Sequence, residues 1–245
     1  MFSRLLNWSQ HLRARLPTLL PSSCAFCGGD SVAAVCKGCH AQFFSRRAHR
    51  CGKCAMQLAD ASANVCGECM KQPPAFDATI VATDYAPPAD QLVLALKFGS
   101  RLELGPLFAG MLRDAMLDAP DAMLPQLLTA TPLGRQRLME RGFNQAVEIA
   151  RPLSRALGVA LDARLVMRQR DTQAQSLLHP DERRKNVRNA FGVRPDAIDR
   201  LRGLHVGVVD DVITTGETLN ELAATLKRFG AARVTNFVFA RTPQK

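Results

Sequence analysis

All eight cysteines lie between Cys24 and Cys69, and the sequence from residue 70 onward has none. They form four Cys-x-x-Cys pairs. One such turn places two thiolates on the same side of a tight bend, and two turns together can close a tetrahedron around Zn²⁺. This spacing predicts two structural zinc sites with four cysteine ligands each. The expected ligands are Cys24, Cys27, Cys36, Cys39, Cys51, Cys54, Cys66 and Cys69.

Three other uses of these cysteines are less suitable. A disulfide framework needs a secreted protein, and the residues before Cys24 do not resemble a signal peptide. A thioredoxin-like redox motif uses one Cys-x-x-Cys pair rather than four. An iron–sulfur cluster stays an alternative, although paired turns favour zinc. Sequential pairing, with the first two turns on one metal and the last two on the other, is the default; spacing alone leaves interleaved pairing open.

The composition of the chain is that of a globular protein. Of its 245 residues 47% are hydrophobic and 22% charged, and no apolar run reaches the roughly 18 residues of a membrane span. The formal net charge is +10. Two four-thiolate zinc sites would lower it to about +6, since four thiolates outweigh one Zn²⁺. This charge favours polyanions without by itself indicating nucleic-acid binding. We expect a soluble, cytoplasmic protein.

Changes in pattern along the chain suggest three parts. Residues 1–20 predict a basic amphipathic helix, which we expect to pack on its own protein rather than on a membrane surface. Residues 21–72 form the expected double zinc ribbon, with four Cys-x-x-Cys turns. Pro73 and Pro74 follow as a short stiff joint. The remaining residues, 76–245, make up the larger domain.

Strand-like and helix-like segments alternate in the larger domain. This alternation predicts an α/β fold with a parallel sheet flanked by helices. We expect Pro152 to kink or end the helix that begins near residue 144. Residues 168–190 form a long polar loop. The strands are expected at 78–83, 126–131, 204–209 and 233–240, and the helices at 91–96, 102–117, from 144, and at 218–229.

The richest segment for chemistry runs from Val208 to Thr218. An apolar strand is followed by Asp210 and Asp211, then by a loop rich in threonine that opens a helix. Adjacent carboxylates suit the recognition of hydroxyl groups with Mg²⁺, and backbone N–H groups at a helix start suit a phosphate. A sugar that carries a phosphate satisfies both halves. In the alternative interpretation the aspartates cap a turn, and Thr218 forms a capping box with Glu221.

This segment resembles the phosphoribosyl-diphosphate (PRPP) motif of type I phosphoribosyltransferases. Further similarity lies in Lys97-Phe98, in the arginine-rich run from Arg135 to Arg141, which we expect to form a loop, and in the Gly142–Gln145 block. These features are similar to those of ComF/GntX-type proteins, which carry a double zinc ribbon before the transferase-like domain. The resemblance implies that PRPP binds with Mg²⁺. It implies ribose contacts at Asp210 and Asp211, catalysis by these two and Arg135, a 5′-phosphate cradle of Thr214, Thr215, Gly216, Glu217 and Thr218, and a pyrophosphate site of Leu133, Gly134, Arg135 and Lys97.

Two functions follow from the resemblance. The first is a phosphoribosyltransferase that acts on an unknown nucleophile such as a nucleobase, in a protein linked to DNA uptake during natural competence. The alternative is a non-catalytic zinc-ribbon module that binds single-stranded DNA and uses the transferase fold as a nucleotide sensor. Its partners would be single-stranded DNA and a DNA-uptake translocase. Replacing Arg46, Arg47 and Arg50 would then weaken DNA binding.

Overall fold

The computed structural model describes residues 22–44, 48–60, 62–119, 121–169 and 189–243. The helix expected at 1–20, and most of the polar loop at 168–190, lie outside these residues. The chain forms two compact units that divide after residue 47, so the division falls inside the expected zinc ribbon, between its second and third turns. Each unit is described by itself, and the three-part division expected from the sequence stays a prediction.

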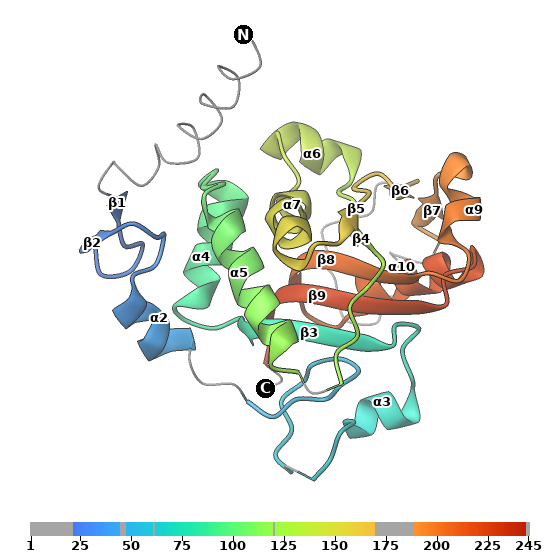
Figure 1. The fold of residues 1–245 in the computed structure, drawn as a ribbon, viewed down its shortest axis with the longest axis horizontal. Coiled ribbons are helices and arrows are strands. Elements are labelled where there is room, and N and C mark those ends of the chain that lie inside the picture. Colours follow the sequence, from blue (N-terminus) through green and yellow to red (C-terminus); the bar gives the residue numbers. More distant parts are fainter. Residues whose placement is uncertain (1–21, 45–47, 61, 120, 170–188, 244–245) are drawn as a thin grey trace, which may run out of the picture. The chain divides into compact units, whose positions relative to one another are not determined.

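The described part of the first unit is a small knuckle built around one helix (Figure 1). Strands β1 (Ser22–Ser23) and β2 (Asp30–Ser31) pair antiparallel, and α2 (Lys37–Phe44) follows. The ring of Phe26 lies 5.8 Å from that of Phe43 and 6.0 Å from that of Phe44, centroid to centroid. So small a segment buries little apolar surface, which agrees with a need for a metal staple.

The second unit contains a five-stranded sheet in the order β3-β9-β8-β4-β5, and every neighbouring pair is parallel. The alternation of strands and helices in the sequence predicts this architecture, and the structure confirms it. A separate antiparallel pair, β6 and β7, lies outside this sheet. The strand bounds are β3 Ala78–Asp84, β4 Leu127–Ala130, β5 Ala160–Leu161, β6 Val166–Arg168, β7 Phe191–Val193, β8 His205–Ile213 and β9 Arg233–Arg241.

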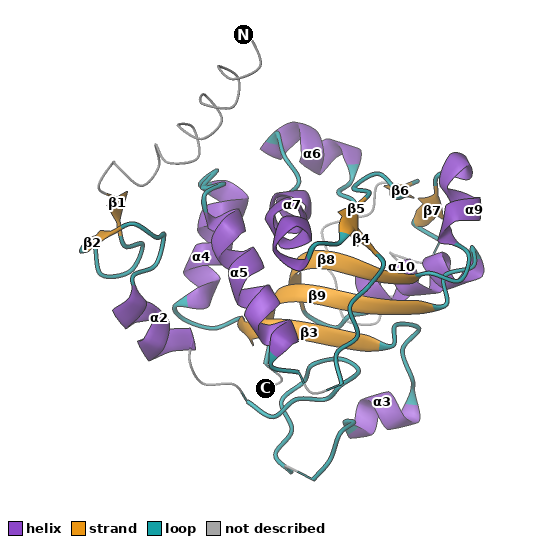
Figure 2. Cartoon of the chain, viewed as in Figure 1, coloured by secondary structure: helices purple, strands orange, loops and turns teal. Residues whose placement is uncertain are grey.

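Helices cover both faces of the sheet (Figure 2). On one face α5 and α7 pack on the strands, and the ring of Phe108 stacks on that of Phe239 at 3.5 Å. On the other face the apolar side of α10, including Leu222 and Leu226, packs against Val206 and Val208 of β8. The helix bounds are α3 Gly67–Lys71, α4 Ala89–Phe98, α5 Leu104–Leu117, α6 Arg135–Arg141, α7 Gln145–Leu157, a 3₁₀ turn at Pro195–Ala197, α9 Ile198–Leu201 and α10 Glu217–Arg228.

Strands β8 and β9 show why the sequence predicted a buried parallel sheet. All but one residue of β8 are buried, and so are all but the first of β9. A parallel strand with helices on both faces has no solvated side, so its sequence is apolar almost without interruption. Such a strand carries two aspartates only where a site requires them.

Two local predictions need correction. The arginine-rich run expected as a loop forms helix α6, which ends at Gly142 in the left-handed conformation (φ 79°). Helix α7 does not end at Pro152 but continues to Leu157, so the expected end of the helix is wrong and the alternative, a kink, stays a prediction. An internal proline removes one backbone hydrogen bond, and here the helix is held by a buried face that includes Ile149 and Leu153. Tertiary packing therefore outweighs the local preference.

Among the described residues, the helices are too short and too polar for any of them to cross a bilayer.

Candidate functional site

A cavity of about 770 Å³ lies at the carboxyl edge of the sheet. The end of β8, the loop after β4 and the start of α10 line it, together with residues of helices α4 and α6. Parallel strands that end at the same edge bring their following loops together, which is why ligands of open α/β sheets bind there. Seven residues predicted for PRPP line this cavity: Lys97, Leu133, Asp210, Asp211, Thr214, Gly216 and Thr218.

The two aspartates are the most deeply buried acidic groups of the cavity. Asp210 is 8% exposed and Asp211 3%. Successive residues of a strand point to opposite faces, so the two carboxylates approach the cavity from different sides. The backbone N–H of Asp211 donates to Oδ1 of Asp210 at 2.9 Å. Burial, followed by the charge of Asp211, raises the pKa of Asp210 to about 8. The pair therefore favours one shared proton, or a cation or hydroxyl-bearing ligand in its place.

Lys97 supplies a counter-charge from α4. Its Nζ lies 2.6 Å from Oδ2 of Asp211, and its side chain is 23% exposed. The contact is an ion pair rather than an aligned hydrogen bond, since Oδ2 makes no hydrogen bond with the described part of the chain. A lysine at this point is placed to meet both Asp211 and a negatively charged ligand beside it.

The loop from Ile213 to the start of α10 has the geometry of an anion site. Gly216 is the N-cap of α10 in the left-handed conformation, at φ 85° and ψ 0°. The first backbone N–H groups of the helix lack partners inside it, and they attract anions. The expected capping box of Thr218 with Glu221 does not form, because the N-cap of α10 is Gly216 rather than Thr218. Thr214 and Thr218 line the cavity.

The loop after β4 is tied to helix α7 by Asn144. Its Nδ2 donates to the carbonyl of Thr131 at 3.0 Å, while its Oδ1 caps α7 by accepting from the N–H of Ala146 at 3.0 Å. The sequence block around residue 144 therefore has a local role, which is to hold the loop that faces the aspartates.

Arginine positions within α6 differ in their access to the cavity. Arg137 and Arg141 line it, whereas Arg135 is exposed and is not among the lining residues. Gly134, Thr215 and Glu217 likewise do not line it. An α-helix turns by 3.6 residues, so positions 137 and 141 share a side that position 135 does not. The role of Arg135 in catalysis and pyrophosphate binding stays a prediction. Because the sequence predicted a loop here, it did not indicate that the Arg135 side chain lies on another side of a helix than Arg137 and Arg141.

An apolar wall completes the cavity, and the sequence gave little sign of it. Tyr85, Leu94 and Phe98 contribute to the lining. The Phe98 side chain is 73% exposed, and the guanidinium carbon of Arg141 lies 5.3 Å from the ring centroid. Of these residues the sequence marks only Phe98, through the family resemblance of Lys97-Phe98. Tyr85 and Leu94 belong to no motif, and only the fold brings them to the cavity.

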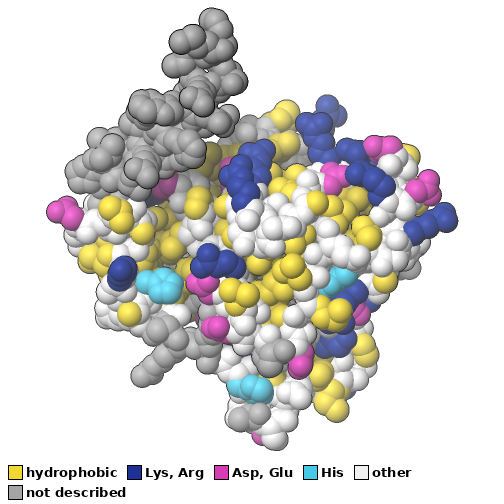
Figure 3. All heavy atoms as spheres, viewed as in Figure 1, with side chains coloured by type: hydrophobic (Ala, Val, Ile, Leu, Met, Phe, Trp, Pro, Cys, Tyr) yellow, Lys and Arg dark blue, Asp and Glu magenta, His cyan; other side chains and the backbone are white. Residues whose placement is uncertain are grey.

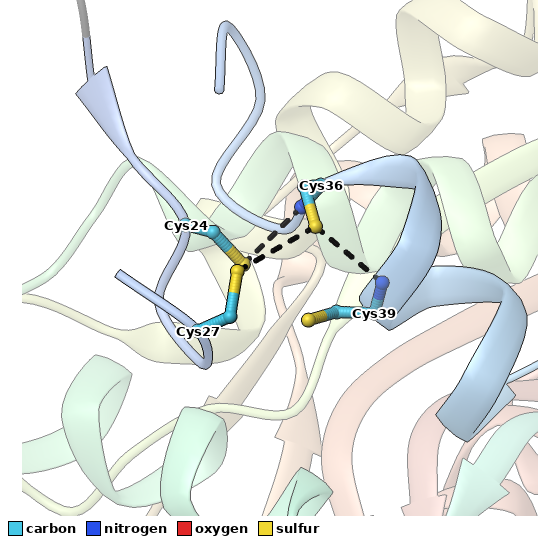
Figure 4. Close-up of side chains that lie close together, drawn as sticks. All are labelled: Cys24, Cys27, Cys36 and Cys39. Carbon is cyan, nitrogen blue, oxygen red and sulfur yellow. Dashed lines mark hydrogen bonds between the residues drawn. The ribbon is translucent and has the colours of Figure 1, made fainter. Parts of the chain in front are cut away.

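The first cysteine quartet consists of Cys24, Cys27, Cys36 and Cys39, with all four Sγ atoms within 4.8 Å of one another (Figure 4). The Sγ atoms of Cys27 and Cys36 are 3.8 Å apart. Tetrahedral bonds of about 2.3 Å to zinc place sulfurs about 3.8 Å apart, so the spacing fits zinc. Backbone N–H groups of Cys36, Cys27 and Phe26 lower the pKa of Cys24 to about 6, which favours the thiolate that a metal needs.

The second quartet groups Cys51, Cys54, Cys66 and Cys69 within the same 4.8 Å limit. The Sγ atoms of Cys54 and Cys66 are 3.6 Å apart, and the N–H of Cys66 donates to Sγ of Cys51 at 3.3 Å. The structure thus pairs the four turns sequentially. Burial raises the pKa of Cys54 to about 11 and that of Cys69 further, so metal binding here must displace protons. The two quartets indicate two zinc sites.

The described residues on the face drawn in Figure 3 do not form a single basic patch. Their Lys and Arg side chains are interspersed with acidic and apolar ones. Arg50, expected to contact DNA, forms an ion pair: its side chain is 17% exposed and Nη2 lies 2.9 Å from Oδ1 of Asp84. Its contact with DNA stays a prediction. Arg46 and Arg47 lie outside the described residues.

Comparison with known proteins agrees with this arrangement. A parallel α/β domain with an acidic pair before a phosphate-type loop, together with two cysteine quartets, defines a zinc-ribbon protein with a phosphoribosyltransferase-type domain. The family model "Phosphoribosyl transferase domain" matches residues 143–245, and "Double zinc ribbon domain" matches residues 16–70.

Two curated relatives extend the comparison over most of the chain. "DNA utilization protein YhgH" of Salmonella typhimurium is 36% identical over 71% of this chain and 76% of its own length. "Competence protein F" of Haemophilus influenzae is 33% identical over 89% of this chain and 96% of its own length. The chain therefore belongs to the ComF/GntX-type family, in which a double zinc ribbon precedes a phosphoribosyltransferase domain.

Proposed function

We propose that this protein binds PRPP with Mg²⁺ at the carboxyl edge of β8 and transfers the phosphoribosyl group to a nitrogen nucleophile. One observation carries the proposal. The cavity combines a buried carboxylate pair, Asp210 and Asp211, with a helix start at Gly216 suited to phosphate. PRPP carries hydroxyls and a 5′-phosphate on one ribose, so it matches both features at once.

The cations of the cavity suit the leaving group. Lys97 lies against Asp211, and Arg137 and Arg141 line the same cavity. In the reaction the bond between ribose C1 and a pyrophosphate oxygen breaks, and pyrophosphate leaves with the electron pair. The nucleophile forms the new C1–N bond and releases its proton to solvent. Bound Mg²⁺ would neutralise pyrophosphate charge, while these side chains steady the departing oxygens.

The acceptor would enter beside the apolar wall. Phe98 offers an exposed ring face under the Arg141 guanidinium, a combination on which a planar nitrogen heterocycle can stack. We therefore propose a nucleobase-like acceptor that contacts Phe98 and Leu94. The sequence alone shows no pattern for recognition of the acceptor, and this apolar wall is the structural feature on which the proposed acceptor class depends.

Turnover is tested by incubating the zinc-loaded full chain with PRPP, Mg²⁺ and single nucleobases, and by measuring pyrophosphate release. We expect one base to accelerate release in the wild type and not in the Asp211→Asn variant. The matched control is Asp199→Asn, whose carboxylate is 94% exposed on α9 and outside the cavity. Release that no base accelerates, or that survives Asp211→Asn, contradicts the proposed transfer.

A role in DNA use is a second candidate, favoured by the printed names of the relatives at 36% and 33% identity. Fluorescence anisotropy of a labelled single-stranded oligonucleotide, measured over a range of salt, tests it. The DNA-binding module predicts an affinity that falls with salt and is unchanged by Asp211→Asn. An absence of binding at low salt contradicts it.

A further inference from the structure

A buried arginine lies behind the candidate phosphate loop. Arg241 ends β9 and is only 4% exposed. Its Nη1 donates to the carbonyl of Ile213 at 3.3 Å and also to the carbonyl of Thr214. The N–H of Thr242 donates to the same Ile213 carbonyl at 3.0 Å. The C-terminal end of β9 therefore holds the peptide groups that follow Ile213 and Thr214, at the start of the loop.

These hydrogen bonds fix where the loop amides point. In a planar trans peptide the C=O and the following N–H point in opposite directions. With the carbonyls of Ile213 and Thr214 directed at Arg241, the N–H groups of Thr214 and Thr215 point away from it. Thr214 lines the cavity, so Arg241 sets the direction in which the start of the loop presents its donors.

A guanidinium buried to this extent needs negative charge nearby. No carboxylate among the described residues forms an ion pair with Arg241, and its Nε finds no acceptor within the described part of the chain. Burial and the charge of Arg50 lower the pKa of Arg241, and the charged thiolates of Cys54, Cys66 and Cys69 act in the opposite direction. The second quartet is therefore a source of negative charge for this guanidinium, provided that contacts hold it near β9.

Contacts fix the second quartet along β3, the strand beside β9. The N–H of Thr79, near the start of β3, donates to the carbonyl of Gly52, and Arg50 pairs with Asp84, the last residue of β3. Asp84 lies opposite Arg241 in the β3–β9 register. Cys54 packs against the apolar cluster that contains Ile213. The first quartet belongs to the other compact unit.

We propose that the zinc-loaded second quartet supplies the counter-charge that holds Arg241 in place, and that Arg241 is a positioning residue for the phosphate loop. Four thiolates on one Zn²⁺ leave a net charge of roughly two negative units, which a buried guanidinium can offset. The second quartet thereby acts on the candidate site through contacts within its own compact unit. The effect on ligand binding rests on the proposed function; the link from metal to loop does not.

Two pairs of full-length variants test the link. Arg241→Met removes the guanidinium, and Arg113→Met, on the exposed side of α5, is its control. Cys66→Ser removes a ligand of the second quartet, and Cys36→Ser removes the corresponding ligand of the first. The readouts are zinc content, hydrogen exchange at the amides of residues 214–218, and PRPP affinity by calorimetry.

We expect Arg241→Met and Cys66→Ser to speed exchange at these amides and to weaken PRPP binding about tenfold, as for the loss of a hydrogen bond to a charged group. Arg113→Met and Cys36→Ser should change neither. If Arg241→Met fails to fold, Arg241→Lys keeps the charge but not the fork, and should show the same exchange. Unchanged exchange in a folded Arg241 variant, or equal effects of Cys36→Ser and Cys66→Ser, overturns the inference.

The two proposals fail separately. If the wild type does not bind PRPP, the proposed function is wrong, whereas faster exchange in Arg241→Met and Cys66→Ser alone still supports the link from metal to loop. If the wild type binds PRPP and both variants bind it equally well, the link is wrong and the proposed function stands.

Discussion

Replacing Asp210 by asparagine should make the unliganded protein more stable at neutral pH while removing a proposed ribose contact. Burial and the Asp211 charge raise the pKa of Asp210 from 3.8 to about 8. With its pKa higher in the folded than in the unfolded state, the group contributes stability that is fully present below pH 3.8 and is lost as the pH rises towards 8. Asparagine is neutral throughout, and its oxygen can still accept from the Asp211 N–H that lies 2.9 Å from Asp210.

The size of the effect follows from the two pKa values. Between pH 5 and pH 7 the unfolded aspartate is ionised and the folded one is not, so the two states differ by one proton. One proton corresponds to about 1.4 kcal/mol per pH unit. The stability of Asp210→Asn relative to the wild type should rise by about this amount per unit and level off above pH 8.

Urea unfolding of both proteins at several pH values measures this difference, and Asp199→Asn serves as the exposed control. Comparing variants cancels the pH dependence of the zinc sites, which both proteins share. A difference that does not change between pH 5 and pH 8 would refute the reasoning, since it would mean that Asp210 is ionised in the fold across this range.

Two further pairs of substitutions test the packing and the site. A Cβ at Gly105 would lie 2.5 Å from the carbonyl oxygen of Glu148, so Gly105→Ala should destabilise the protein by about 1–3 kcal/mol. A Cβ at Gly110 meets no atom within 4 Å, so Gly110→Ala should stabilise the protein by about 0.5–1 kcal/mol. Thermal unfolding distinguishes the two variants. Arg137→Met should weaken PRPP binding about tenfold and Arg135→Met less than twofold, by calorimetry, because only Arg137 lines the cavity. The opposite order would restore the sequence-based role of Arg135.

Much of the architecture could be predicted because its signals are local. Most residues of β8 and β9 are apolar since both faces of these strands are covered, and four cysteine pairs at short spacing leave few alternatives to metal binding. The aspartate pair and the following loop lie within one continuous segment. The position of these residues at the carboxyl end of a strand could therefore be predicted from this segment alone.

The remaining features depend on contacts between distant parts of the chain. Lys97 meets Asp211 from α4, and Arg241 reaches the loop from the strand beside it. Neither pairing has a signal in spacing. The direction of the Arg135 side chain depends on whether residues 135–141 form a helix, and the pattern of charges alone does not predict that they do. Pro152 shows the same limit, since burial of its neighbours keeps α7 continuous.

The central claim is that the carboxyl edge of β8 is a PRPP site, and calorimetric titration tests it most directly. PRPP with Mg²⁺ is added to the zinc-loaded wild type and to the Asp210→Asn/Asp211→Asn double variant. We predict saturable binding to one site per chain in the wild type and no binding in the double variant. Heat absent from both proteins, or equal in both, would contradict the claim and leave DNA binding as the leading function.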